Sequence, residues 1–188
     1  RPQDSLDSVL ADGFHHAGRV ALTGQQDGYF RHYRGTANEV ARALCDGWIH
    51  QGERTGRMGP GSPTGDVESS GFVFCIENHD QVGNRVDGLH LAGLVDPDAY
   101  RAASALLLFA PERVMLFQGQ EWATERNFNY FTDHHEELGR LVTEGRRNEF
   151  RHFAAFREHP ERIPDPQLEA TLDASRLDPS ESRRKAWS

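Results

Sequence analysis

The sequence has few cysteines and no long apolar run, which argues against a disulfide-rich or membrane-spanning protein. It contains only two cysteines in 188 residues, Cys45 and Cys75, too few for a disulfide framework. Because Cys75 lies within an apolar run, we expect both to be reduced thiols. No apolar run approaches the roughly 20 residues that cross a bilayer, and Arg1–Asp4 opens no apolar signal segment. The sequence therefore predicts no membrane partner and a cytoplasmic location.

Positive charge is also scarce. The chain has 21 basic and 29 acidic residues, a formal net charge of -8. Such a chain has no general electrostatic attraction to nucleic acid or anionic lipid. Its hydrophobic content of 37% and charged content of 27% are ordinary for a globular domain with a core. It does not begin with methionine, and we expect it to be a piece of a longer protein.

A short apolar run followed by a polar cluster occurs three times along the chain. The three runs are Leu6–Leu10, Phe72–Ile76 and Val114–Phe117. The last two are continuously apolar, which is typical of strands buried on both faces in a parallel sheet. Helical stretches between the runs indicate βαβ units. The sequence therefore predicts an α/β fold in which helices cover a parallel sheet.

The helices are expected at four places. They run from Asp12 to about Leu22, from Ala37 to Trp48, from Asp98 to Phe109 and from Asp133 through Phe156, with apolar Phe150 and Phe153 on the same face. Asp133 and Glu136 resemble a capping box for the last helix, and Arg146-Arg147 is interpreted as part of its solvated face. Residues 52–70 are rich in Gly, Pro and Ser and predict a mobile loop. We expect one domain over residues 1–160 and a polar tail or linker over 161–188.

Each polar cluster follows a predicted strand, at the edge of a parallel sheet where ligands bind. The densest cluster is Asn78-His79-Asp80-Gln81. Its carboxylate, imidazole and amides can bind sugar hydroxyls or stabilise a developing positive charge. The alternative is a strand-end turn in which Asn and Asp side chains bind local backbone groups. His79 could also be a buried, hydrogen-bonded histidine.

Two further clusters are weaker. His15-His16, with His79, Asp80 and Glu121, could suggest a metal site, but adjacent histidines on a regular element point apart, and no motif has zinc-ligand spacing. We therefore expect neither a metal nor a cofactor. Glu121-Trp122 could form a sugar platform with a hydrogen-bonding carboxylate, or Trp122 could fill the rim of a barrel.

Several segments together resemble the α-amylase family of glycoside hydrolases. Residues 72–85, FVFCIENHDQVGNR, are similar to the family's last conserved strand region, and the HDQVGN form resembles its trehalohydrolase subgroup. Other segments resemble that subgroup in the same order along the chain: Asp12–Ala17 with Leu22-Thr23-Gly24, His50–Glu53, Phe117–Trp122, Phe131–His134, Glu144–Phe150 and Asp165–Gln167. Leu10, Gly13 and Gln120 depart from the subgroup's Trp, Asp and Glu.

The resemblance implies a partial (β/α)8 TIM barrel containing about strands six to eight. It implies part of an α-glucan hydrolase that releases trehalose from maltooligosyl trehalose by retaining glycoside hydrolysis. Asp80 matches the third carboxylate of the family's catalytic set. The substrate-binding residues implied, together with the strand-end clusters above, are Asn78, His79, Gln81, Val82, Gly83, Asn84, Asp12, His15, His16, Glu121 and Trp122.

The family's nucleophile and acid/base carboxylates have no match in these 188 residues. Groups that act as a unit do not work piecemeal, so we expect the chain alone to be a very poor glycosidase. The alternatives are another α-glucan enzyme such as a branching enzyme, a non-catalytic glucan-binding fragment, or a different hydrolase built from the remaining His, Asp and Glu groups. Open sheet edges predict self-association or pairing with a complementary barrel half.

Overall fold

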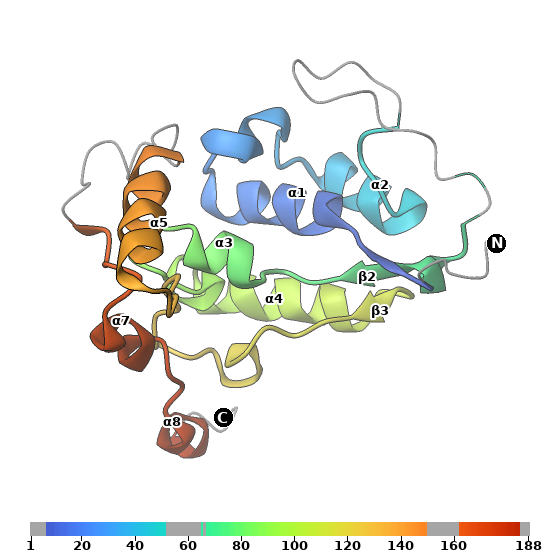
Figure 1. Cartoon of the computed structure of the whole chain (residues 1–188). Helices are drawn as coiled ribbons and strands as arrows, with labels where there is room; N and C mark the ends of the chain where they lie inside the picture. Colours follow the sequence, from blue (N-terminus) through green and yellow to red (C-terminus); the bar gives the residue numbers. More distant parts are fainter. Residues whose placement is uncertain (1–6, 52–64, 66, 150–161, 185–188) are drawn as a thin grey trace. The chain divides into compact units, whose positions relative to one another are not determined.

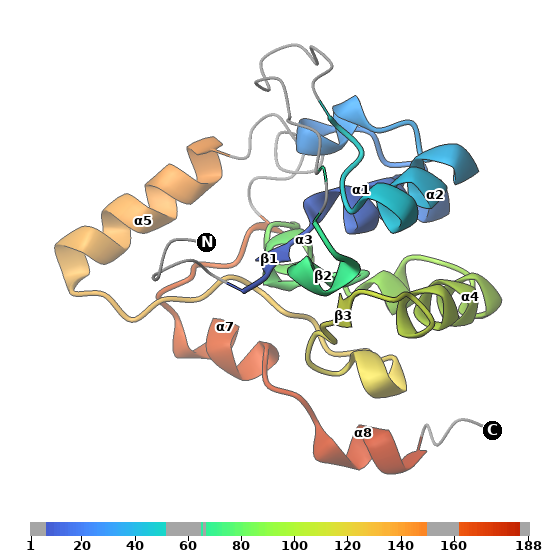
Figure 2. The same ribbon diagram turned by 90° about the vertical axis from the view of Figure 1, so that its right-hand side faces the viewer.

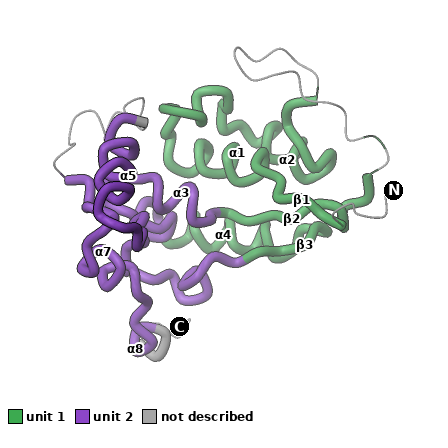
Figure 3. The backbone as a smooth tube through the Cα atoms, viewed as in Figure 1, with its two compact units in different colours: residues 1–76, 97–115 green, residues 77–96, 116–188 purple. Residues whose placement is uncertain are grey.

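The computed structural model describes residues 7–51, 65, 67–149 and 162–184. They fall into two compact units (Figure 3). Unit 1 comprises Arg1–Ile76 and Pro97–Met115, and unit 2 comprises Glu77–Asp96 and Leu116–Ser188. Each unit is therefore assembled from two separate stretches of the sequence.

Unit 1 contains a three-stranded parallel sheet in the order β1-β2-β3 (Figures 1 and 2). The strands are short: β1 is Val9–Leu10, β2 is Phe72–Phe74 and β3 is Arg113–Val114. In the central strand, Val73 pairs with Leu10 on one side and with Arg113 on the other. The predicted parallel sheet is confirmed, with regular pairing over fewer residues than the apolar runs contain.

Helices of unit 1 cover this sheet. They are α1 (Asp12–Thr23), α2 (Ala37–Asp46) and α4 (Pro97–Leu108), with 3-10 turns η1 (Gly28–His32) and η2 (Ser69–Gly71). α1 packs against β2 and α2. The Phe14 and Phe74 rings stack with centroids 4.6 Å apart, and both side chains are buried. Burying such aromatic pairs supplies much of the free energy that holds a helix on a sheet.

The ends of α2 show how local chemistry sets a helix boundary. Thr36 Oγ1 accepts a hydrogen bond from Glu39 N at 3.2 Å, and the Glu39 carboxylate accepts one from Thr36 N at 3.3 Å. This capping box pairs two amides that the helix leaves open. Gly47, with φ of 74°, ends the helix in the left-handed region. A Cβ there would lie 2.4 Å from the Phe72 ring, so only glycine fits this close approach.

The described part of unit 2 consists of one longer helix, several short ones and connecting segments. The helices are α3 (His79–Gly83), α5 (Glu136–Glu149), α7 (Glu169–Ala174) and α8 (Pro179–Arg184), with 3-10 turns η3 (Leu91–Gly93) and η4 (Gln120–Trp122). Aromatic contacts join its segments: the half-buried Phe117 ring lies 5.1 Å from the Phe128 ring and 5.5 Å from the ring of buried His90.

The predicted start of the last long helix at Asp133 is wrong, because α5 begins at Glu136. Thr132 N donates to Pro166 O at 2.8 Å, and Gln167 Nε2 donates to His134 O at 2.7 Å. These bonds hold residues 132–134 against the segment before α7 and out of helical geometry. Phe150, Phe153 and Phe156 lie outside the described residues.

Two other expectations concern segments that are described only in part. Most of the predicted loop 52–70, including Gly52-Glu53, lies outside the described residues. The predicted boundary near residue 160 stays a prediction, although α7 and α8 lie beyond it. Cys45 and Cys75 are free thiols, as expected. None of the helices in the described part of the chain combines the length and apolar character of a transmembrane span.

Candidate functional site

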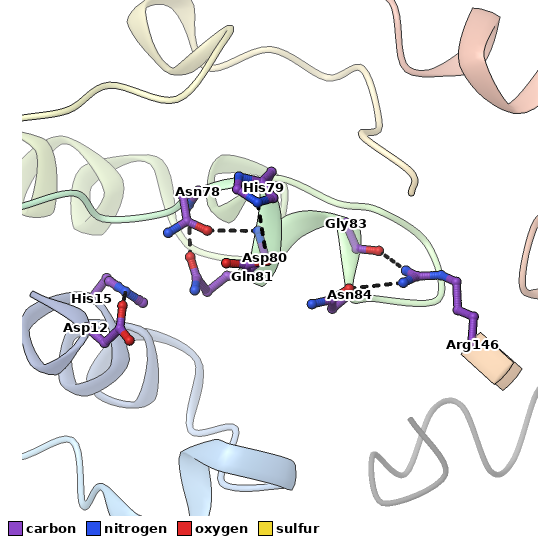
Figure 4. A network of polar contacts seen from close by, with 9 residues as sticks. All are labelled: Asp12, His15, Asn78, His79, Asp80, Gln81, Gly83, Asn84 and Arg146. Carbon is purple, nitrogen blue, oxygen red and sulfur yellow. Dashed lines mark hydrogen bonds and ion pairs between the residues drawn. The ribbon is translucent and has the colours of Figure 1, made fainter. Parts of the chain in front are cut away.

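The Asn78–Gln81 cluster follows β2 and begins α3. Asn78 is the N-cap: its Oδ1 accepts a hydrogen bond from Asp80 N at 2.8 Å, and Gln81 Oε1 accepts one from Asn78 N at 2.9 Å (Figure 4). Both side chains are buried, with 2% and 3% of their surfaces exposed. This capping box fixes the backbone at the turn. The strand-end interpretation, which named Asn and Asp, therefore holds for Asn78, and Gln81 has the second capping role in place of Asp80.

Asp80 and His79 are arranged differently. Their side chains are 58% and 70% exposed, and His79 Nε2 lies 3.4 Å from Asp80 Oδ1 (Figure 4). Among the described residues, the Asp80 carboxylate accepts no backbone hydrogen bond, and its exposure leaves it open to a ligand from solvent. Its position in the first turn of α3 places a negative charge near the positive end of that helix. A rigid turn thus presents an exposed carboxylate beside an exposed imidazole.

The rest of α3 is enclosed. Val82 is fully buried and Gly83 is buried, so both contribute packing at this end of the cluster. A Cβ on Gly83 would lie 3.4 Å from the Phe128 ring, a tight contact. Asn84 is partly exposed and forms the C-cap.

The prediction that Arg146 lies on a solvated helix face is wrong. Its side chain is buried at 8% exposure, whereas Arg147 is exposed. Arg146 Nη1 donates to Asn84 Oδ1 at 3.1 Å, and Nη2 donates a short hydrogen bond to Gly83 O (Figure 4). The guanidinium carbon also lies 4.3 Å from the Tyr130 ring centroid. α5 thus turns this side chain onto the C-terminal end of α3, where a cation is favourable.

Sequence reasoning missed the pair formed by Glu77 and His90. His90 Nδ1 lies 2.8 Å from Glu77 Oε1, and Leu91 N donates to Glu77 Oε2 at 2.6 Å. Glu77 is completely buried and His90 is 3% exposed. The pair ties the segment after α3 back to the residue before Asn78. A carboxylate directly after the apolar run Phe72–Ile76 was the available signal, since a buried carboxylate needs a partner.

Asp12 and His15 lie at the start of α1 in unit 1. His15 Nε2 lies 3.1 Å from Asp12 Oδ1 (Figure 4). This hydrogen bond lowers the pKa of Asp12 below its usual value. Asp12 is exposed, whereas His15 is 1% exposed and its Nδ1 is buried without a hydrogen-bond partner among the described residues. Asp12 is therefore the member of this pair that a ligand can reach.

His16 lies among aromatic side chains. Its Nδ1 is 3.2 Å from the Tyr33 hydroxyl oxygen, and the Tyr29 and Phe30 ring centroids lie 5.1 and 5.2 Å away. Burial lowers the pKa of His16 to about 3, with repulsion from His15 as a further cause. Burial likewise raises the pKa of Tyr33. His16 is therefore a neutral imidazole at ordinary pH.

The two neighbouring histidines do not point apart, contrary to expectation. Their ring centroids lie 4.3 Å apart in an edge-to-face arrangement. Across the described ranges, no group of three or more His, Cys, Asp or Glu side chains is placed to hold a metal ion.

Glu121 and Trp122 lie in η4 of unit 2, after β3. Glu121 is exposed and Trp122 is partly exposed. The Trp122 indole Nε1 donates to Glu181 Oε2 at 3.4 Å. Of the predicted residues, unit 2 thus contains Asn78–Asn84, Glu121 and Trp122, and unit 1 contains Asp12, His15 and His16.

No family model matches the chain. Among curated proteins, it is 46% identical over 178 residues to the malto-oligosyltrehalose trehalohydrolase of Deinococcus radiodurans, covering 92% of this chain and 29% of that protein. It is 36% identical over 176 residues to the one from Saccharolobus solfataricus, with the same coverage of 92% and 29%. It is 35% identical over 184 residues to the one from Arthrobacter ramosus, covering 96% of this chain and 31% of that protein.

A solved structure agrees. A crystal structure from Salmonella typhimurium, provisionally named an alpha amylase, superposes with a TM-score of 0.83 at 34% identity, covering 97% of this chain and 32% of that chain. The chain thus spans about 30% of the length of its relatives. From its sequence and fold together, the chain belongs to the malto-oligosyltrehalose trehalohydrolase family, as a homologue of the C-terminal part of those proteins.

Proposed function

We propose that the chain is part of an α-glucan hydrolase that releases trehalose from maltooligosyl trehalose by retaining glycoside hydrolysis. The names of the curated relatives support this substrate and reaction. The likeness to an alpha amylase supports a share of a (β/α)8 barrel, in which the three parallel strands would be about strands six to eight. Cytoplasmic location stays a prediction.

The observation that carries the proposal is the exposed Asp80 carboxylate on a turn fixed by the Asn78–Gln81 capping box. In this role Asp80 accepts hydrogen bonds from hydroxyls of the glucosyl unit next to the scissile bond. Its negative charge stabilises the oxocarbenium-like transition state more than the ground state, and only such a difference accelerates the chemical step.

The remaining predicted residues have supporting roles. His79 and Asn84 hydrogen-bond sugar hydroxyls beside Asp80, while Asn78, Gln81, Val82 and Gly83 form the rigid wall that presents them. Glu121 and Trp122 supply a carboxylate and an aromatic surface after β3. Asp12, with His15 behind it, and neutral His16 supply polar groups after β1.

The nucleophile and the acid/base of a retaining mechanism match no residue of this sequence. We propose that other segments of a longer protein provide them. Acid–base catalysis alone contributes about 10²–10⁴-fold. We therefore expect the 188-residue chain to bind α-glucan while turning it over hardly at all.

The first prediction concerns Asp80. Asp80→Asn should weaken binding of maltoheptaose about three- to tenfold, because a charge-assisted acceptor becomes a neutral amide. Isothermal titration calorimetry measures this loss. Asp173→Asn is the matched control, because Asp173 is an exposed carboxylate of α7 whose Oδ1 lies 2.9 Å from Arg176 Nη1. Equal maltoheptaose affinity in wild type and Asp80→Asn would remove Asp80 from the proposed site.

A second candidate function is a non-catalytic fragment that binds α-glucan or assembles through its open sheet. Exposed apolar side chains in unit 1 favour it, with Phe109 89% exposed, Leu108 59% and Val9 48%. In the described part of the sheet, β1 and β3 each have a partner on one side only. Glucan binding without any turnover, together with self-association, would favour this function.

A further inference from the structure

The turn that carries Trp122 has an unfavourable backbone. Gly119 begins it at φ 81°, and Ala123 follows Trp122 at φ 51° and ψ 58°, the left-handed region. Among the described residues, Ala123 is the only residue other than glycine that has a positive φ. Residues with a Cβ enter this region at a cost, so surrounding contacts must hold the turn.

One carboxylate holds this turn from the C-terminal end of the chain. Glu181 Oε2 accepts hydrogen bonds from Thr124 Oγ1 at 2.6 Å and from Trp122 Nε1 at 3.4 Å. Glu181 Oε1 accepts one from Glu125 N at 2.7 Å. Glu181 lies in α8 and is 6% exposed, so these bonds are shielded from water. The three donors come from both sides of Ala123.

We propose that Glu181 is a positioning residue for Trp122: it holds the strained turn and orients the indole. An aromatic platform must keep one ring orientation to stack on a sugar, and the indole N–H is the only polar handle of a tryptophan. Because one oxygen of Glu181 receives both the indole and the Thr124 hydroxyl, ring and backbone are fixed together. That Trp122 contacts α-glucan rests on the function proposed above.

In this proposal, α8 contributes to sugar binding through its hold on Trp122. α8 begins 57 residues after Trp122, at Pro179, yet its carboxylate determines how the indole is held. Ser175 adds to the same attachment, because its Oγ accepts a hydrogen bond from Asn129 N at 3.0 Å. The segment 122–129 is thus fastened at both of its ends.

The second prediction tests this attachment in the full chain. Glu181→Gln keeps the size of the side chain but loses its charge and one acceptor oxygen. The Trp122 indole Nε1–H resonance, assigned with Trp122→Phe among the three tryptophans, should shift and exchange faster with water. Maltoheptaose affinity should fall about three- to tenfold, since a hydrogen bond to a charged group is lost. Glu169→Gln, at an exposed glutamate in α7, should change neither.

A rescue separates positioning from general stability. Ala123→Gly removes the Cβ that makes the left-handed conformation costly. In the Glu181→Gln background it should recover part of the lost affinity, because the turn then needs less support from Glu181, while the indole resonance stays shifted because its acceptor is still neutral. If Glu181→Gln lowers the melting temperature without moving the Trp122 resonance, Glu181 is merely structural and the inference is overturned.

The remaining outcomes separate this inference from the proposed function. An unchanged indole resonance in Glu181→Gln overturns the inference whatever the sugar does. A shifted resonance with unchanged maltoheptaose affinity supports the attachment and overturns sugar contact by Trp122. If wild type binds no maltoheptaose, the proposed function fails, and the indole resonance alone decides the role of Glu181.

Discussion

The His16 imidazole packs against the rings of Tyr29, Phe30 and Tyr33, which largely shield it from water. This burial makes the stability of the fold depend on pH. The pKa of His16 falls to about 3 in the folded chain, whereas an unfolded histidine titrates near 6.5. Between about pH 3 and pH 6.5, His16 is protonated in the unfolded state but neutral in the folded state. The contribution of His16 to stability is therefore present above about pH 6.5 and is lost as pH falls towards 3.

The third prediction follows from this titration. The free energy of unfolding should decline from pH 7 to pH 5 by at most about 1.4 kcal/mol per pH unit on account of His16. His16→Phe should flatten that slope. Urea unfolding at several pH values measures it. His135→Gln, at an exposed histidine before α5, is the control, and an identical slope in wild type and His16→Phe would contradict the prediction.

At single positions, the sequence predicted side-chain exposure correctly where the neighbours in sequence decide it, and failed where a distant residue does. Asp80 follows an apolar strand and is exposed as a site carboxylate should be. Arg146 was misjudged, because a helix face looks solvated until its neighbour is known, and that neighbour, Gly83, is 63 residues earlier. Glu181 and Glu77 were missed for the same reason: their donors are not adjacent in sequence.

At the scale of elements, α3 is closed at both ends by side chains. The Asn78–Gln81 capping box pairs its N-terminal amides, and Arg146 binds its last carbonyl, Gly83 O. A helix of five residues is too short to be stable by itself. Its persistence, and with it the orientation of Asp80, therefore depends on these two attachments.

The fourth prediction concerns the C-terminal attachment. Arg146→Lys keeps the charge but cannot donate to both Gly83 O and Asn84 Oδ1 from one planar group. We expect a loss of about 1.5–3 kcal/mol in local stability, seen as faster hydrogen exchange at the Val82 and Asn84 amides. Arg147→Lys, at the exposed neighbour, should leave exchange unchanged. Equal protection in both variants would show that Arg146 does not hold α3.

The elements that the sequence predicted best are those with complete local signals. α2 has its capping box at Thr36 and its terminal Gly47, and α4 begins at Pro97, one residue before the expected start at Asp98. α3 was missed because five residues show no helical periodicity. The start of α5 was misplaced because a capping-box pattern at Asp133 is overridden by the hydrogen bonds of Gln167, which a local pattern does not contain.

At the scale of the whole molecule, the small sheet of unit 1 has two edge strands that could pair with another chain. Its β1 and β3 are edge strands within the described residues, and Val9 and Val114 on them are 48% and 38% exposed. Exposed apolar edges promote pairing with another sheet. We propose that they bind a second copy or a complementary barrel half.

The fifth prediction follows. Sedimentation velocity at micromolar concentration should show dimers or larger species of the wild-type chain. Val9→Lys combined with Val114→Lys should shift the population towards monomer, because charge on an edge strand opposes pairing. Leu168→Lys, at an apolar residue of unit 2 that is 57% exposed, is the control. A monodisperse wild-type monomer would contradict the prediction.

The division into units has a further consequence for anyone who wishes to dissect the protein. The backbone crosses from one unit to the other three times, after Ile76, Asp96 and Met115. No single cut in the chain can release either unit whole, and no contiguous gene fragment encodes one. Truncation from either terminus would remove parts of a unit and leave its remaining apolar surface without cover. We therefore expect that the two units can be expressed only together, as one chain.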